Sequence, residues 1–125
     1  MHENDISGII VDCAYQIHTK LGPGLLESVY EAVLEHELLK RGLSVVTQQP
    51  MPVVWEDVRL DIGFRADMIV GGKVVVEIKS VEAVAPVHPK QLRTYLRLMD
   101  LKLGLLINFN VPLIKDGITR VVNNL

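Results

Sequence analysis

The 125-residue sequence has one cysteine, few aromatic residues and no long hydrophobic run. The single cysteine, Cys13, excludes an internal disulfide and a cysteine-based zinc site, and it favours a reducing, cytoplasmic setting. No apolar run approaches the ~20 residues that a membrane span needs, and no signal-peptide core follows the acidic N-terminus. We therefore expect one cytoplasmic domain over residues 1–125, with no membrane partner.

Charge is nearly balanced, at a net −2, so the total gives no sign of a nucleic-acid partner. Its distribution is uneven, because residues 86–125 carry six bases and two acids, whereas residues 1–44 carry three bases and seven acids. This asymmetry can hold a polyanion on one side of the protein, although scattered surface lysines explain it equally well. Aromatic residues make up only 5% of the chain, which excludes a stacking platform for single-stranded nucleic acid.

The hydrophobic spacing predicts an α/β fold with a mixed sheet and helices on both faces. A helix capped by Asp5 comes first, and Leu26, Val29 and Tyr30 lie on the buried side of the second helix. Pro50 and Pro52 interrupt the first strand, so we expect an edge or irregular segment there. A Gly-Gly turn joins the next two strands as a hairpin. The expected helices cover residues 6–21, 25–41 and 89–100, and the expected strands cover 43–49, 53–55, 60–70, 74–79, 103–109 and 118–122.

The strongest candidate site is the pattern Asp67, Glu77, Ile78, Lys79 across the predicted hairpin. Side chains alternate along a strand, so Glu77 and Lys79 point the same way, and a slight stagger brings Asp67 to the Glu77 side. An acid and a lysine inside a valine-rich strand are costly unless they are paired or bind a metal. Two carboxylates beside a lysine indicate a magnesium site with a proton-handling group, although a salt bridge is the simpler role for Lys79.

A second candidate group lies at the start of the second helix. The acid Glu27 is favoured there by the helix dipole, and that alone would explain it as a structural residue. Tyr30 follows three positions later on an adjacent part of the same face. Packing is the simplest role for Tyr30, with contact to the site as the alternative.

Together these residues resemble the GxxExxY family, a branch of the PD-(D/E)XK nuclease superfamily. Gly24, Glu27 and Tyr30 match the family motif, and Ala66 stands where the superfamily's name has proline. The resemblance runs from about residue 6 to the end of the chain and includes the segments 61–67, 77–79, 91–95, 106–112 and 115–117.

The resemblance implies a restriction-endonuclease-like α-β-β-β-α-β core, with an extra N-terminal helix. It implies that Asp67 and Glu77 bind Mg²⁺ or Mn²⁺, and that Lys79 positions or deprotonates the attacking water. Glu27 would be a further ligand or water holder, and Gln91 would lie near the substrate phosphate. Magnesium chemistry suits this set, completed by the backbone carbonyl of Ile78, because Mg²⁺ takes few carboxylates and keeps several waters.

The predicted third helix carries basic residues at spacings of three and four. Lys90, Arg93 and Arg97 form a cationic edge beside Gln91 and Tyr95, which we interpret as phosphate contacts or as a solvated surface. The remaining candidate substrate contacts are Tyr30, Arg65 and Tyr95, although Arg65 is better placed to order the acids Asp61 and Asp67.

The sequence thus predicts a magnesium-dependent nuclease that hydrolyses phosphodiester bonds, of DNA rather than RNA, with the nucleic-acid backbone as partner. A homodimer is a possible assembly. Two alternatives stay open: a non-catalytic binding module that keeps the fold, and a hydrolase of small phosphodiesters or nucleotides. The histidines His18 and His88, at the end of the first helix and at the cap of the third, lack metal-ligand spacing and are assigned structural roles.

Overall fold

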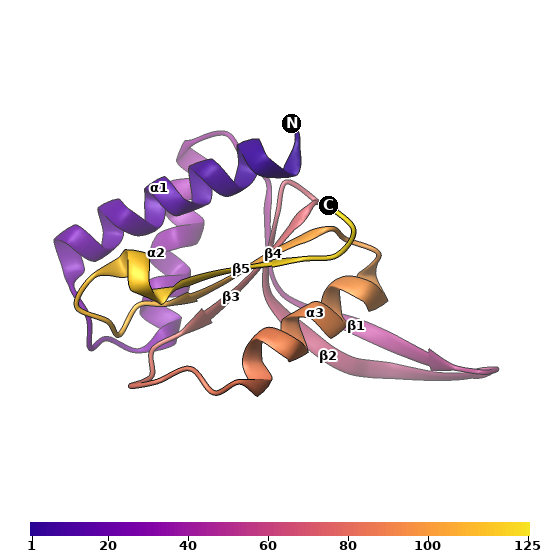
Figure 1. Cartoon of the computed structure of the whole chain (residues 1–125). Helices are drawn as coiled ribbons and strands as arrows, with labels where there is room; N and C mark the ends of the chain where they lie inside the picture. Colours follow the sequence, from indigo (N-terminus) through magenta and orange to yellow (C-terminus); the bar gives the residue numbers. More distant parts are fainter.

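The computed structural model describes residues 1–125 as three α-helices, five strands and one short 3-10 helix (Figure 1). The predicted order of helix, helix, three strands, helix and strand is confirmed, followed by the short closing strand. None of the helices combines the length and the apolarity that crossing a membrane requires. In chain order the elements are α1 (Glu3–Leu21), α2 (Glu27–Lys40), β1 (Val45–Trp55), β2 (Val58–Val70), β3 (Val74–Lys79), α3 (Val87–Met99), β4 (Leu103–Asn108), η1 (Ile114–Gly117) and β5 (Ile118–Val122).

The five strands form one sheet in the order β1-β2-β3-β4-β5. Only β3 and β4 are parallel, so the sheet is mixed, as predicted. Antiparallel neighbours need only short turns, whereas a parallel pair needs a crossover, and α3 supplies it. Figure 1 shows α1 and α2 on one face of the sheet and α3 on the other.

Strand β3 separates two hydrophobic cores. Val74, Val76 and Ile78 pack with α1 and α2 in the larger core, while Val75 packs with α3 in the smaller one. Each of these side chains is almost fully buried, which contributes roughly 1.5–3 kcal/mol apiece. Because side chains alternate along a strand, Glu77 lies on the same side as Val75, the side that α3 covers.

The turn between β2 and β3 sets the register of this hairpin. Gly71 and Gly72 have φ angles of +61° and +68°, a left-handed conformation that residues with a side chain rarely adopt. A Cβ on Gly71 would also lie 2.8 Å from the Cδ1 of Ile6. Val70 and Val74 pair directly across the turn, so the predicted glycine turn is confirmed.

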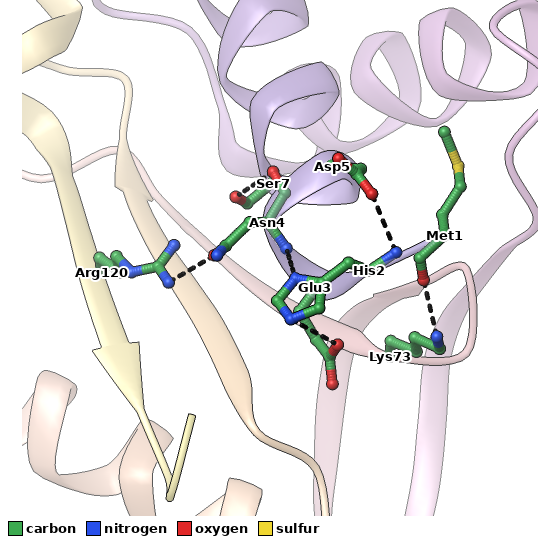
Figure 2. A network of polar contacts seen from close by, with 8 residues as sticks. All are labelled: Met1, His2, Glu3, Asn4, Asp5, Ser7, Lys73 and Arg120. Atoms are coloured by element: carbon green, nitrogen blue, oxygen red, sulfur yellow. Dashed lines mark hydrogen bonds and ion pairs between the residues drawn. The ribbon is translucent and has the colours of Figure 1, made fainter.

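The first turn of α1 differs from the prediction that Asp5 is its cap. The cap is His2, whose Nδ1 accepts a hydrogen bond from the backbone N of Asn4 at 2.9 Å. Asp5 instead accepts from the backbone N of His2 at 3.0 Å, which completes a capping box (Figure 2). Lys73 of the β2–β3 turn donates to the carbonyl of Met1 at 2.6 Å, so the N-terminus is tied to the sheet.

The predicted edge position of the segment with Pro50 and Pro52 is confirmed, because β1 is the outermost strand and its register shifts between Met51 and Val53. The two predicted pieces form one strand, since a missing N–H on the open side of an edge strand costs no ladder bond. A further expectation, on the cap of α3, is wrong. His88 lies inside α3 and does not cap it, since the helix begins at Val87 after Pro86.

The stripe of buried side chains on α2 is narrower than the sequence predicts. Tyr30, Leu34 and Leu38 are fully buried, whereas Leu26 and Val29 are 73% and 39% exposed. Leu26 precedes the helix as its N-cap residue, so it lies outside the helical stripe.

The far half of the β1–β2 hairpin projects from the body of the protein (Figure 1). We call residues 53–62 the arm. All residues of β2 from Val58 to Gly63 are exposed, and buried residues begin to alternate only at Phe64.

Candidate functional site

The predicted carboxylates Asp67 and Glu77 lie side by side where the β2–β3 ladder ends. The last paired residues of that ladder are Met68 and Val76. Just beyond them, the Oδ2 of Asp67 accepts a hydrogen bond from the backbone N of Ile78 at 2.8 Å. The backbone N of Asp67 donates to the Oε1 of Glu77 at 3.3 Å. Side-chain bonds thus continue the ladder and hold the two carboxylates together.

Burial dominates the electrostatics of this pair. It raises the pKa of Glu77 to about 8, with the negative charge of Asp67 as the second cause. The positive charge of Lys79 partly opposes the rise in this pKa. Lys79 makes no direct ion pair with either carboxylate, so the salt bridge considered for it is not formed.

Strand β2 changes the layer against which it packs at Asp67. Ala66 belongs to the core under α3, whereas Met68 belongs to the core under α1 and α2. Residues two apart on a regular strand face the same side, so the strand must twist strongly between them. Across from Asp67, Gln48 of β1 has a φ of +52°, a strained conformation for a non-glycine residue.

Gln48 and Glu31 join this cluster, and the sequence prediction did not include either. The Nε2 of Gln48 donates to both carboxylate oxygens of Glu31 at 3.2 Å and lies 3.5 Å from the Oδ1 of Asp67. Burial raises the pKa of Glu31. The hydrogen bond from Gln48 opposes this rise in the pKa, and the charge of Asp67 adds to it. Glu31 lies one helical turn after Glu27, and this spacing of four is the signal that could have identified it.

Glu27, the predicted helix carboxylate, is the first residue of α2 and is half-buried. No hydrogen bond or ion pair joins it to Asp67 or Glu77. The preceding loop is held at the end of β3, because the Oγ of Ser80 donates to the carbonyl of Leu25 at 2.6 Å. The start of α2 therefore lies against the end of the strand that carries Glu77.

Tyr30 has a structural position. Its ring is fully buried and stacks on Phe109, with centroids 4.4 Å apart. Its hydroxyl donates to the carbonyl of Gly22 at 2.6 Å and accepts from the backbone N of Leu25 at 3.2 Å. The predicted substrate contact does not fit this position, because the side chain has no exposed surface. Tyr30 instead fixes the loop that leads into α2.

On the α3 side of the sheet, Tyr95 of α3 packs against strand β2. Its ring stacks on Phe64 of β2 with centroids 4.1 Å apart. Burial raises the pKa of Tyr95, and the charges of Glu77 and Asp67 add to the rise. Tyr95 is therefore close to both carboxylates. Gln91, one turn earlier on α3, is exposed and makes no hydrogen bond within the protein.

The predicted basic residues do not all approach this pair. Arg65 is exposed and does not order Asp61, which instead pairs with Arg59 at 3.4 Å. Lys90 and Arg93 line a separate hollow between α3 and β5.

The donor set fits a divalent cation. One oxygen of each carboxylate accepts a backbone N–H. The second oxygen of Glu77 is available to a ligand, and the Oδ1 of Asp67 has only the 3.5 Å contact with the Nε2 of Gln48. Mg²⁺ is typically held by one or two carboxylates and several waters. The chain has no group of three or more histidine, cysteine, aspartate or glutamate side chains arranged to hold a metal ion. The fit therefore depends on Asp67, Glu77 and the neighbouring carbonyl of Ile78.

Comparison with known proteins places this geometry in a family. No curated protein matches the chain. The crystal structure of SSO0001 matches 98% of this chain at 21% sequence identity with a TM-score of 0.58, and the match spans 60% of the length of that protein. This likeness shows the fold: a restriction-endonuclease-like α/β sheet, with α1 preceding an α-β-β-β-α-β core. The family model for the PD-(D/E)XK nuclease superfamily matches residues 4–121, and the chain therefore belongs to that superfamily.

Proposed function

We propose that this protein is a metal-dependent nuclease that hydrolyses phosphodiester bonds, with DNA as the preferred substrate. The observation that carries the proposal is the pairing of Asp67 with Glu77 at the open end of the β2–β3 ladder. A pair of carboxylates that are close together and buried is costly when both are ionised, and a divalent cation offsets that cost.

Each of the surrounding side chains has a proposed role. Asp67, Glu77 and the carbonyl of Ile78 would hold Mg²⁺ or Mn²⁺, which supplies charge stabilisation on the phosphate and lowers the pKa of a bound water. Lys79 positions the attacking water or takes its proton. The stacked ring of Tyr95 limits the access of solvent to the carboxylates from the α3 side.

In this proposal, α2 and α3 each contribute supporting groups to the site. Glu27 and Gln91 would hold water or the substrate phosphate from the two rims of the site, and Arg65 would contact the nucleic-acid backbone. Glu31 joins them as the helix carboxylate that reaches Asp67 through Gln48.

We further propose that the chain is of the GxxExxY branch. Gly24 adopts a φ of +98°, and the hydroxyl of Tyr30 bonds on both sides of it, to Gly22 and Leu25. These contacts give the glycine and the tyrosine around Glu27 a structural role, which supports the proposal. The proposal includes one domain over residues 1–125, a cytoplasmic setting, and a homodimer formed through a free sheet edge, β1 or β5.

The test is cleavage of supercoiled plasmid, duplex and single-stranded oligonucleotides, RNA and a small phosphodiester, each with Mg²⁺ and with a chelator. We expect cleavage of duplex DNA that requires the metal and is lost in Glu77→Gln and Asp67→Asn. Asp61→Asn is the matched control, since Asp61 is an exposed acid on the arm, paired only with Arg59. Hydrolysis of the small diester alone would favour the small-substrate alternative. Binding of nucleic acid that persists in every variant without cleavage would favour the non-catalytic module.

A further inference from the structure

Strand β1 is irregular at the position that faces Asp67. The β1–β2 ladder keeps one register on both sides of Gln48, yet no ladder pair joins Gln48 to Asp67. Gln48 has a φ of +52°, in the left-handed region, although it lies within a strand. A residue with a side chain is strained in this region unless its surroundings favour the conformation. The strain is therefore placed at the point of the ladder that faces a proposed cation ligand.

The side-chain amide of Gln48 lies among three carboxylate oxygens. Its Nε2 donates to the Oε1 and the Oε2 of Glu31, each at 3.2 Å, and lies 3.5 Å from the Oδ1 of Asp67. Glu31 belongs to α2, Gln48 to β1 and Asp67 to β2. One amide thus connects a helix and two strands at the edge of the candidate site.

The two oxygens of Asp67 meet different partners. The Oδ2 accepts a hydrogen bond from the backbone N of Ile78 at 2.8 Å, while the Oδ1 faces the Nε2 of Gln48. Contacts at both oxygens restrict the rotation of the carboxylate group. A carboxylate oxygen has two lone pairs, so the Oδ1 can meet the amide and a cation at the same time. Groups that hold a ligand in this way add to the affinity for the metal.

An amide suits this position because it is a neutral donor. It can bridge Glu31 and Asp67 without adding positive charge, so the negative charge that attracts a divalent cation is kept. A lysine at the same place would form ion pairs with the two acids and would compete with the cation. Neither Glu31 nor Asp67 forms an ion pair in the chain.

We propose that Gln48 is a positioning residue of the cation site. Its amide, held by Glu31, orients the Oδ1 of Asp67 toward the cation. The role toward the cation rests on the proposed function, whereas the bridge between Glu31 and Asp67 does not. Because the amide is presented from a strained backbone, replacing Gln48 by glycine should relieve the strain and weaken cation binding together.

The test compares Gln48→Gly and Gln48→Ala with the wild type, by calorimetric titration of Mg²⁺ and by thermal melts without metal. Both variants lack the amide, so both should bind Mg²⁺ about 10-fold more weakly. Glycine tolerates the left-handed φ and alanine does not, so Gln48→Gly should melt roughly 3–5 °C above Gln48→Ala. Gln49→Ala is the matched control, because the amide of Gln49 donates only to the carbonyl of Pro50. It should bind Mg²⁺ as the wild type does.

The bridge is measured without metal, by NMR of the side-chain amide of Gln48. Its signals should move in Glu31→Gln and in Asp67→Asn, and stay in place in Asp61→Asn on the arm. Amide signals that move in neither site variant would overturn the bridge and the positioning role. Mg²⁺ affinities equal to that of the wild type in both Gln48 variants would overturn the positioning role alone. A wild type that binds no Mg²⁺ would overturn the cation proposal and the positioning role with it, and moving amide signals would then support only the bridge.

Discussion

The two halves of strand β2 have the same alternating sequence pattern but opposite surroundings. In the body, Ala66, Met68 and Val70 are fully buried, while in the arm Leu60 and Ile62 are 52% and 62% exposed. Helices cover both faces of the body, and none covers the arm. Alternation therefore predicts a strand, whereas burial depends on what packs against that strand.

The candidate site lies close to the boundary between these two halves. Phe64, stacked on Tyr95, is the outermost buried residue of β2, and Asp67 follows three residues later. Here the side chains of β2 change from packing in the core under α3 to packing in the core under α1 and α2. At this boundary Glu77 is buried enough to have a raised pKa, while its second carboxylate oxygen stays available to a ligand.

The largest expected effect is the difference in unfolding free energy between a substitution in the core and a substitution in the arm. Met68→Ala removes a fully buried side chain and should lower the free energy of unfolding by about 2–5 kcal/mol. Leu60→Ala removes an exposed side chain and should change it by less than about 0.5 kcal/mol. Urea unfolding followed by far-UV circular dichroism measures both. Comparable losses in the two variants would mean that something covers the arm in solution.

The next effect concerns the buried carboxylate of Glu77. Its pKa is about 8 in the folded protein against 4.5 for the ordinary group, so the folded state keeps a proton that the unfolded state releases between these values. Stability from this group therefore falls as pH rises from 4.5 to about 8, and the loss is complete above that range.

The variant Glu77→Gln tests this pH dependence. The amide cannot ionise, so the variant should gain thermal stability relative to the wild type as pH rises, with the largest difference above pH 8 and none below 4.5. Asp61→Asn on the arm should give no such trend. A difference in melting temperature that stays constant with pH would contradict the burial of Glu77.

The smallest expected effect comes from the only tryptophan, Trp55, at the tip of the arm. Its side chain is 71% exposed, so its emission in the native protein should resemble that of tryptophan in water and be readily quenched by acrylamide. Unfolding should barely change this emission while circular dichroism reports a full transition. A blue-shifted, protected native signal would indicate that a second copy or another partner covers the arm.

Much of the architecture could be predicted from the sequence because it depends on local rules. The glycine turn at Gly71 and Gly72 fixes the β2–β3 register, and the alternation of Val74 to Lys79 places Glu77 opposite the larger core. The neighbouring positions of Asp67 and Glu77 follow from these two features. The crossover through α3 follows from the order of strand, helix and strand.

The rest depends on contacts that no local pattern encodes. Gln48 contacts Asp67 and Glu31 from a backbone with a positive φ, a conformation that glutamine has no particular tendency to adopt. The exposure of Leu26 and of the arm reflects which surfaces the helices leave uncovered. Arg120 of β5 donates to the Oδ1 of Asn4 on α1, although 116 residues separate them in sequence.

The most direct measurement is the titration of the Glu77 carboxyl carbon by NMR, in the metal-free wild type and in Asp67→Asn. We expect a midpoint of about 8 in the wild type, because burial and the charge of Asp67 both favour the protonated form. The midpoint should fall in the variant, and added Mg²⁺ should displace the proton in the wild type. A midpoint near 4.5 in both proteins would show that the carboxyl groups are solvated and independent, which would contradict a shared cation site.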